Sequence, residues 1–327
     1  MRVFLTGGTG FIGSEVARRL RSRGDDVRAL VRDPERATAL RELGCELVVG
    51  DLSDEAALVR ACRGMTHVVH AAAVYAVGIP ASRRDELVDV NVRGTERVLG
   101  AALTAGVSKA VYVSTVAVFG NTGGEVAYEG WARTASGYTS VYEETKTCAH
   151  KRAQEIASRG LPLVIVQPGT VYGRDDPSTF GELLGQFLEG TLPALPFPDL
   201  GVSPVHRDDV AAGILLALDE GVPGQSYVLT SDSVRVRDLI GELAELSGRK
   251  PPRTVPTVLL RALAPAGAVV GPALGFPPNL RELISSSDGV TFWATGDKAR
   301  KDLGWEPRPL REGLAELVAA RSPATPR

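Results

Sequence analysis

The chain has 327 residues, 44% of them hydrophobic, and a formal net charge of −2. The hydrophobic content is ample for a folded core, and the dispersed charges form no basic patch for nucleic acid, so we expect a small-molecule substrate as the partner. The three cysteines lack metal-ligand spacing, which predicts buried thiols, no metal site and a reducing, cytoplasmic location.

A short apolar strand at residues 2–5 runs directly into a glycine-rich turn and then into a helical pattern. In this turn Gly7 allows a tight bend, Gly10 has no side chain to keep a pyrophosphate from the backbone, and Gly13 lets the helix pack close to the strand. The helix start, with Phe11 and Ile12, presents free N–H groups to phosphates. Because strand, turn and helix follow in this order, the sequence predicts a dinucleotide site. The strand begins at once, so we expect no secretory leader.

The second predicted strand, residues 26–31, ends at the position that distinguishes NAD from NADP. An NAD site usually has an acidic residue there for the ribose 2′-hydroxyl, whereas an NADP site has a cation. Here the acidic residue is absent and Arg32 follows the strand, where it would bind a 2′-phosphate with Arg28 or Arg36 assisting. We therefore expect NADP to be preferred, while Asp33, one residue further on, keeps NAD possible.

Short apolar strands continue to alternate with amphipathic helices through the first half of the chain. The strands are predicted at 46–49, 67–70, 111–114 and 163–166, and the helices at 11–23, 34–43, 83–103 and 141–158. This alternation predicts an α/β fold with a Rossmann-type doubly wound parallel sheet, which binds ligands at the carboxyl ends of its strands. Asp51, after the third strand, would accept from the adenine amino group; alternatively it is an ordinary acid beside a helix.

A phenol and an ammonium lie one turn apart on a predicted helix, at Tyr142 and Lys146. A nearby cation favours the phenolate, so we expect Lys146 to lower the pKa of Tyr142. Two hydroxyl groups, Ser114 and Thr115, follow the fifth strand at the same edge of the sheet. Such a hydroxyl can donate to a substrate carbonyl while the tyrosine delivers a proton and a nicotinamide the hydride.

The regular alternation breaks down after Gly173. We expect residues 1–173 to form the dinucleotide-binding domain, with elements around 203–230 returning to it. Residues 174–202 and 231–321 then form mainly a smaller C-terminal substrate-binding lobe.

Two late segments are distinctive. The apolar stretch 255–276 is interrupted by Arg261, Pro265 and Pro272, so we expect a helical cap over an apolar pocket and no membrane span. Residues 322–327 are predicted to be a disordered tail.

An ordered set of motifs runs through the chain. It comprises residues 6–13, Asp51-Leu52, His70-Ala71-Ala72-Ala73, Asn91-Val92-Arg93-Gly94-Thr95, residues 113–120, Tyr142-x-x-x-Lys146, Pro168-Gly169-Thr170-Val171-Tyr172-Gly173, residues 205–211 and residues 297–305. Together they resemble the extended short-chain dehydrogenase/reductase superfamily, of the NAD-dependent epimerase/dehydratase type. The resemblance covers nearly the whole chain, and it specifies the superfamily better than the substrate.

The resemblance implies residue roles. Thr115, rather than Ser114, would be the catalytic hydroxyl, Tyr142 the general acid/base, and Lys146 also the ligand of the nicotinamide ribose. Asn91 would either connect the proton path or cap a helix, whereas His70 and His206 are expected to be structural. The further cofactor contacts implied are Leu52, Ala71, Ala72, Ala73, Pro168, Gly169 and Val171, beside the glycine turn, Arg32 and Asp51. Helices 83–103 and 141–158 would form a four-helix bundle in a homodimer.

Differences from the motifs of the superfamily reduce the number of candidate activities. Val116-Ala117 stands where sugar-nucleotide dehydratases of the superfamily have Asp-Glu, so dehydration is not expected. Residues 167–170 are closer to the dihydroflavonol-reductase-like branch than to the epimerases, although Gln167 replaces that branch's usual Arg.

The leading hypothesis is an NADP(H)-dependent carbonyl reductase or alcohol dehydrogenase with a largely apolar substrate. Loops 75–84 and 120–138 and the lobe would hold that substrate, with contacts expected from Tyr75, Thr115, Tyr138 and Tyr172. The runner-up is a sugar or sugar-nucleotide epimerase, and a third possibility is an NADP-sensing regulator without catalysis.

Overall fold

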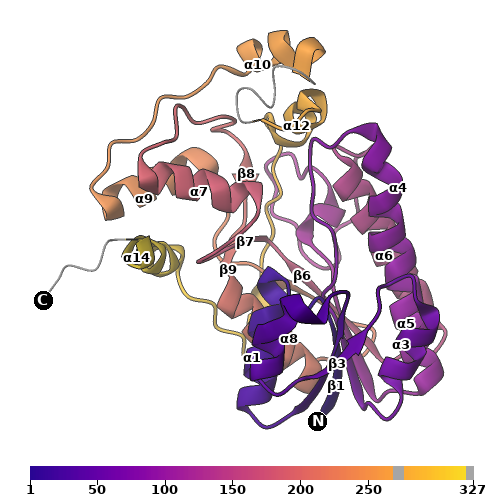
Figure 1. The fold of residues 1–327 in the computed structure, drawn as a ribbon. Coiled ribbons are helices and arrows are strands. Elements are labelled where there is room, and N and C mark those ends of the chain that lie inside the picture. Colours follow the sequence, from indigo (N-terminus) through magenta and orange to yellow (C-terminus); the bar gives the residue numbers. More distant parts are fainter. Residues whose placement is uncertain (268–275, 322–327) are drawn as a thin grey trace, which may run out of the picture.

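A seven-stranded sheet forms the base of the molecule in the computed structural model, which describes residues 1–267 and 276–321 (Figure 1). Every pairing in it is parallel, in the order β10-β6-β5-β4-β1-β2-β3. The strands are β1 (Arg2–Thr6), β2 (Asp26–Val31), β3 (Glu46–Val49), β4 (His67–His70), β5 (Lys109–Val113), β6 (Leu163–Pro168) and β10 (Ser226–Leu229). The expected α/β class and doubly wound sheet are thus confirmed.

The strand order reverses between β1 and β4. From β1 the chain goes to β2 and β3 on one side, and then crosses back to β4, β5 and β6 on the other. Loops that leave the carboxyl ends of β1 and β4 therefore diverge, and an open crevice remains between them.

Helices cover both faces of this sheet. One apolar core lies between the sheet and helices α1 (Phe11–Ser22), α8 (Arg207–Asp219) and α13 (Asp297–Leu303). A second core lies on the other face beneath α3 (Glu55–Cys62), α5 (Gly94–Ala105) and α6 (Val141–Ser158). The strands between them are almost continuously apolar, as burial on both faces requires. The short elements are η1 (Pro34–Ala37), α2 (Thr38–Glu42), η2 (Ala81–Arg83), α4 (Arg84–Leu87), the π-helical segment η3 (Val88–Arg93) and η4 (Val116–Phe119).

A smaller lobe stands over the carboxyl ends of the strands (Figure 1). Its helices are α7 (Thr179–Glu189), α9 (Val236–Ser247), α10 (Thr257–Leu263), η5 (Ala264–Ala266), α12 (Leu280–Ser287) and α14 (Leu310–Arg321). Two small sheets join it to the base, one of β7 (Thr170–Tyr172) with β9 (Pro204–His206) and one of β8 (Gly201–Val202) with β11 (Val234–Arg235). The buried faces of α7, α9 and α14 share one core with Tyr172.

Helix α13 departs from the expected domain boundary. The sequence assigned it to the lobe, but Ala299, Leu303 and Trp305 belong to the core on the α1 face of the sheet. The indole N–H of Trp305 donates to the carbonyl oxygen of Asp209, 2.8 Å away. The chain therefore returns to the base a second time before it ends in α14.

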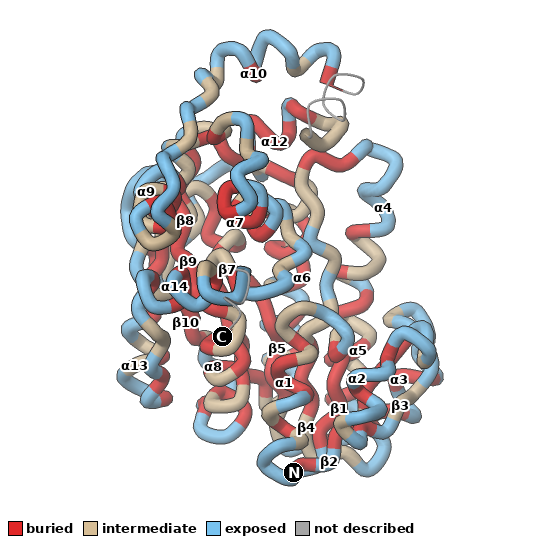
Figure 2. Tube along the Cα trace, turned by 60° about the vertical axis from the view of Figure 1, so that its left-hand side comes forward, coloured by how far each residue is buried: buried red, intermediate tan, exposed pale blue. Residues whose placement is uncertain are grey.

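The expected cap at 255–276 is partly present as α10, which packs through Leu260 onto α12 and turns Val258 and Leu259 outward (Figure 2). Residues 268–275 of that cap and the expected tail at 322–327 lie outside the described residues. Within the described ranges the structure has no helix that is both long and apolar enough to span a bilayer.

Candidate active site

A cleft of about 1080 Å³ lies between the sheet and the lobe. Most of the residues singled out in the sequence line it: Gly7, Gly10, Phe11, Ile12, Gly13, Arg32, Asp51, Leu52, Ala71, Ala72, Ala73, Tyr75, Thr115, Tyr142, Lys146, Gly169 and Val171. Four do not line it, namely Asn91, Tyr138, Pro168 and Tyr172. Motifs from distant parts of the chain therefore meet at one surface.

The glycine turn can be built only from glycine at two positions. Gly7 has φ +76°, and a Cβ on it would lie 2.7 Å from the backbone nitrogen of Ala72. A Cβ on Gly13 would lie 2.1 Å from the carbonyl oxygen of Gly7. Gly10 caps α1 without a side chain, and the first turn of α1 contains no acidic residue. The exposed N–H groups of this turn fit a pyrophosphate.

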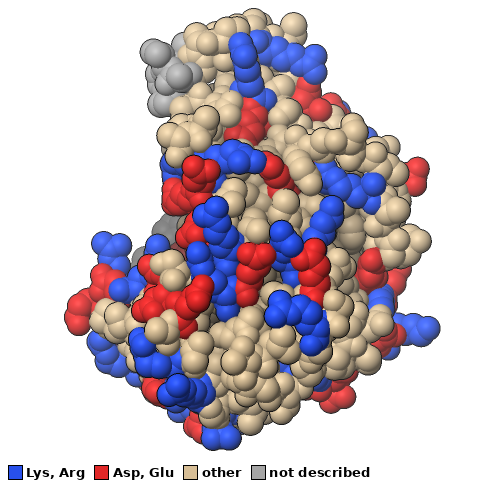
Figure 3. Space-filling view, turned by 90° about the vertical axis from the view of Figure 1, so that its right-hand side faces the viewer, with Lys and Arg blue, Asp and Glu red and all other residues tan. Residues whose placement is uncertain are grey.

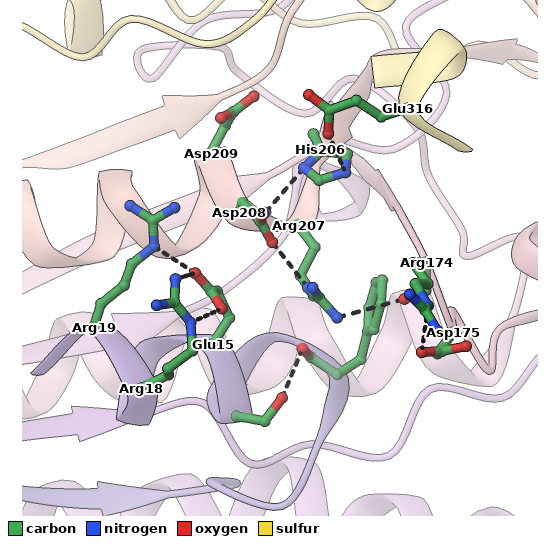
Figure 4. A network of polar contacts seen from close by, with 12 residues as sticks. Glu15, Arg18, Arg19, Arg174, Asp175, His206, Arg207, Asp208, Asp209 and Glu316 are labelled. Carbon is green, nitrogen blue, oxygen red and sulfur yellow. Dashed lines mark hydrogen bonds and ion pairs between the residues drawn. The ribbon is translucent and has the colours of Figure 1, made fainter. Parts of the chain in front are cut away.

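Charged side chains of α1, among them Glu15, Arg18 and Arg19, lie near Arg207 and Asp208 at the start of α8 (Figure 4). The guanidinium of Arg207 donates to Asp208 at 3.1 Å and lies 5.2 Å from the ring centre of Phe11. The Nδ1 atom of His206 accepts from the backbone N–H of Asp208 at 3.3 Å and so caps α8. This contact fits the structural role expected for His206.

Arg32 is the exposed cation at the end of β2 and lines the cleft. Asp33 does not line the cleft, and its carboxylate accepts from the N–H of Glu35 at 3.0 Å and pairs with Arg36 at 3.4 Å. Arg28 is turned away from the cleft, since it pairs with Glu46 at 2.8 Å. Help from Arg28 does not fit this orientation, whereas help from the exposed Arg36 stays a prediction.

Asp51 lies across the cleft from the glycine turn. Its carboxylate accepts from the N–H of Ser53 at 2.7 Å and from the hydroxyl at 2.6 Å. These hydrogen bonds, with the charge of Arg32 adding to them, lower the pKa of Asp51. The side chain is thus an ionised acceptor beside the region where an adenosine would lie.

The two hydroxyl groups after β5 have different partners. The hydroxyl of Ser114 is hydrogen-bonded to Nδ1 of His150 at 2.9 Å, away from Tyr142. Thr115 caps η4 by accepting from the N–H of Ala117 at 3.2 Å, and it lines the same cleft as Tyr142. Because Ser114 is bonded to His150, Thr115 is the better candidate for the hydroxyl that acts with Tyr142.

Tyr142 is half-buried on the cleft wall, and the ring of Tyr75 packs edge-on against it with centroids 4.7 Å apart. Burial raises the pKa of Tyr142, the neighbouring Tyr75 adds to the increase, and the nearby Thr115 hydroxyl offsets it only in part. The expectation that Lys146 lowers this pKa is not met in the protein alone.

The reason lies in where the ammonium of Lys146 points. Its Nζ donates to the carbonyl oxygen of Val113 at 2.9 Å and to the hydroxyl of Tyr112 at 3.1 Å, both on β5. Burial lowers the pKa of Lys146 to about 7. The lysine is thus held against the sheet below Tyr142, and sequence inspection missed Tyr112 because nothing in its strand marks it.

Asn91 has a third role, neither of the two expected from the sequence. It lies buried in the π-helical segment η3. Its side-chain oxygen accepts from the N–H of Val74 at 2.8 Å, and its Nδ2 donates to the carbonyl of Val74 at 3.0 Å and to the hydroxyl of Thr145 at 3.1 Å. Asn91 therefore fastens the loop after β4 to α6.

His70 lies between two threonine hydroxyls, 2.7 Å from Thr6 and 3.0 Å from Thr95. Burial lowers the pKa of His70 to about 3, so the ring is neutral. This placement fits the structural role expected for it.

Three expected contact residues have other surroundings. Tyr172 is buried in the lobe core, where its hydroxyl donates to the carbonyl of Leu310 at 3.4 Å. Tyr138 is exposed, with the guanidinium of Arg133 4.6 Å from its ring centre. Pro168 is paired inside the sheet with Leu229. The predicted substrate role of Tyr138 and Tyr172 does not fit these positions.

The part of the cleft under the lobe is mainly apolar, although Asp176, Glu182, Gln186 and several hydroxyl side chains also line it. Its lining includes Val77, Phe180, Leu183, Leu192, Phe197, Leu200, Val202, Val236, Phe276, Leu283 and Phe292. Among the cleft-lining residues of the described chain, Arg32 and Lys146 are the only Arg or Lys side chains. Arg32 belongs to the glycine-lined part and Lys146 lies where the two parts meet, so the lobe side chains of the cleft provide no cation to bind a diphosphate.

Comparison with known proteins gives consistent matches along the chain. The model of the NAD dependent epimerase/dehydratase family matches residues 3–230. A putative dihydroflavonol 4-reductase from Synechocystis is 33% identical over 96% of this chain and 93% of the relative. Sterol demethylase protein B from Methylococcus capsulatus is 31% identical over 98% of each. The solved structure of gox2253 superposes with a TM-score of 0.83 at 34% identity, covering 97% of both chains.

Proposed function

The chain belongs to the NAD dependent epimerase/dehydratase family, and we propose that within it the protein is an NADP(H)-dependent carbonyl reductase acting on a largely apolar ketone or aldehyde, or on the alcohol in the reverse direction. The observation that carries this proposal is the composition of the cleft. Thr115 and Tyr142 lie where a glycine-lined part meets a part lined by apolar side chains.

The residues divide the work of such a reduction. The bound nicotinamide would supply or take up the hydride. Tyr142 gives the proton to the carbonyl oxygen, and Thr115 donates a hydrogen bond to the same oxygen. Lys146, which is buried and hydrogen-bonded to Tyr112, would bind the nicotinamide ribose. The apolar walls exclude water and orient the substrate by shape.

Arg32 supports the preference for NADP. It is the cation at the end of β2 that lines the cleft, and Asp33, the acidic residue that follows it, does not line the cleft. A guanidinium there matches the geometry of a 2′-phosphate.

An epimerase acting on sugar nucleotides fits less well. A diphosphate in the substrate part would need cations, and the apolar lining offers none among the described residues. The similarity to a protein named as a reductase agrees with this choice.

The test is to incubate the purified protein with NADPH and a panel of apolar ketones and aldehydes, and to follow the absorbance of the reduced cofactor. We expect NADPH to be consumed one for one with the alcohol formed. Epimerisation of a sugar nucleotide without net cofactor change, or binding of NADP without turnover on any carbonyl, would overturn the proposal.

Two Tyr→Phe variants, one inside and one outside the cleft, test whether turnover depends on this site. Tyr142→Phe removes the proton donor, and we expect turnover to fall about 100-fold or more. The control is Tyr128→Phe, since Tyr128 is exposed and does not line the cleft. Turnover above about a tenth of wild type in Tyr142→Phe would contradict the assigned role.

We also propose a homodimer through α5 and α6, which lie side by side on one face of the sheet (Figure 1). Their outer surface carries interspersed charges, including the pair of Arg152 with Glu96 at 3.0 Å (Figure 3). Light scattering is expected to give twice the chain mass; a monomer at working concentration would refute the dimer.

A further inference from the structure

Helix α12 of the lobe contacts the start of the helix that carries Tyr142. The carboxylate of Glu282 accepts a hydrogen bond from the backbone N–H of Val141 at 2.7 Å, although 141 residues separate the two. Glu282 is only 9% exposed, so this contact lies inside the molecule. It joins the substrate lobe directly to the residue before Tyr142.

The first turn of α6 shows why the contact matters. The first N–H groups of a helix have no partner within the helix. Ser140 satisfies one of them, because its hydroxyl accepts from the N–H of Glu143 at 3.1 Å. Glu282 satisfies another from outside the helix, the N–H of Val141. A carboxylate at this end of a helix is also favoured by the helix dipole.

The second carboxylate oxygen of Glu282 is linked through Asn279 to the loop that carries Tyr75. It accepts from Nδ2 of Asn279 at 3.1 Å. The backbone N–H of Asn279 donates to the carbonyl of Gly78 at 2.9 Å, and its side chain to the carbonyl of Ile79 at 3.3 Å. These carbonyls belong to the loop that carries Tyr75, whose ring packs on Tyr142. One carboxylate thus contributes to holding both tyrosines.

Helix α12 is also a wall of the cleft. Leu283, Ser286 and Ser287 of the same helix line it, within about one and a half turns of Glu282. A further hydrogen bond runs from the hydroxyl of Ser285 to the carbonyl of Thr139 at 2.7 Å. A substrate that presses on this wall therefore presses on a helix fixed to the first turn of α6.

We propose that Glu282 is a positioning residue, which sets the first turn of α6 and thereby the place of the Tyr142 hydroxyl relative to Thr115. This inference rests on the proposed function of Tyr142. Because Glu282 lies on α12, which lines the cleft, it connects the position of the bound substrate to the position of the proton donor Tyr142.

The test compares Glu282→Ala and Glu282→Gln with a control, Glu312→Ala. Glu312 lies exposed in the first turn of another lobe helix, α14, away from the cleft lining. We expect Glu282→Ala to lower kcat about tenfold or more, since small misplacements of reacting groups are costly. The Kd for NADPH should stay within about twofold, because the glycine turn is untouched. Glu282→Gln keeps an oxygen acceptor for Val141 and should recover most of kcat, and Glu312→Ala should match wild type.

A second measurement does not depend on turnover. Hydrogen exchange of the peptide covering residues 139–146 should be about tenfold faster in Glu282→Ala and unchanged in Glu312→Ala, while NADPH binding shows that both variants are folded. Unchanged exchange in Glu282→Ala overturns the inference whatever the activity. Unchanged kcat beside an active wild type also overturns it and leaves the proposed function standing. A wild type without carbonyl turnover refutes the proposed function instead.

Discussion

The two parts of the cleft are built on different principles. The glycine-lined part is made of backbone at the ends of β1, β2 and β4, where a Cβ on Gly13 would come within 2.1 Å of a carbonyl oxygen. The apolar part is made of side chains from the lobe, such as Phe197 and Leu283. The first depends on space that no side chain can enter, and the second on side chains that other apolar ones can replace. We therefore expect all-or-none effects in the first part and graded effects in the second.

The largest effect should come from Gly13→Ala. The added methyl group would displace the turn by an ångström or more, and we expect cofactor affinity to fall about 100-fold or more. Gly100→Ala is the matched control, because a Cβ on Gly100 in α5 has no neighbour within 4 Å. That variant should bind normally and gain about 0.5–1 kcal/mol in the free energy of unfolding. Titration of cofactor fluorescence measures the cofactor affinity of both variants, and urea unfolding measures the stability of Gly100→Ala. Normal cofactor binding by Gly13→Ala would contradict the expected difference between the two parts of the cleft.

The apolar part should respond by degrees to Phe197→Ala. Phe197 lines the cleft from a left-handed backbone conformation, φ +48°, which is rare for a bulky residue. Loss of its ring should raise KM for an apolar ketone about 10- to 30-fold and leave the Kd for NADPH unchanged. Leu260→Ala removes a side chain from the same core cluster that does not line the cleft. If both variants raise KM equally, the Phe197 ring affects KM only by stabilising the lobe and does not contact the substrate.

Arg32→Ala tests the outer edge of the glycine-lined part, where a side chain does the binding. Because Arg32 is exposed, we expect the Kd for NADPH to rise only about tenfold, with the Kd for NADH unchanged. Arg36→Ala is the comparison, as Arg36 pairs with Asp33. An equal loss of NADH affinity would show that Arg32 does not contact the 2′-phosphate.

The remaining prediction concerns the stability of the protein where the two parts meet. The pKa of Lys146 is lowered to about 7 in the folded protein, against 10.5 ordinarily. Between these values the unfolded chain binds more protons, so the free energy of unfolding should rise with pH above about 7, by at most about 1.4 kcal/mol per unit. Lys146→Met should lack this rise, whereas Lys151→Met, on the exposed side of the same helix, should keep it. Urea unfolding at pH 7 and pH 9 measures this free energy for each variant. If it changes with pH equally in wild type and Lys146→Met, the lowered pKa of Lys146 is contradicted.

Sequence alone predicts the glycine-lined part well, because its requirements are local. The strands expected at 26–31, 46–49 and 67–70 are β2, β3 and β4 to the residue. The turn with Gly7 and Gly13 can be recognised in the sequence because only glycine fits its backbone geometry. Tyr142, Lys146 and Thr115 were also expected at one sheet edge, and they line one cleft.

What sequence could not supply are contacts set by packing. Nothing near Glu282 indicates that it meets Val141, because that pairing depends on how the lobe sits over the sheet. The direction of the Lys146 ammonium depends in the same way on Tyr112, a residue without a motif. The return of α13 to the sheet was missed because its amphipathic pattern fits either core.

The π-helical turn η3 has a consequence for comparing relatives. Each residue of an α-helix turns the next by about 100°, so a homologue one residue shorter between Val88 and Asn91 would carry its asparagine to another side of the helix. Its amide would then miss the backbone of Val74, and the tether of that loop would be lost. A one-residue gap at this point of an alignment thus marks members whose loop before Tyr75 is anchored differently, even where every catalytic motif is retained.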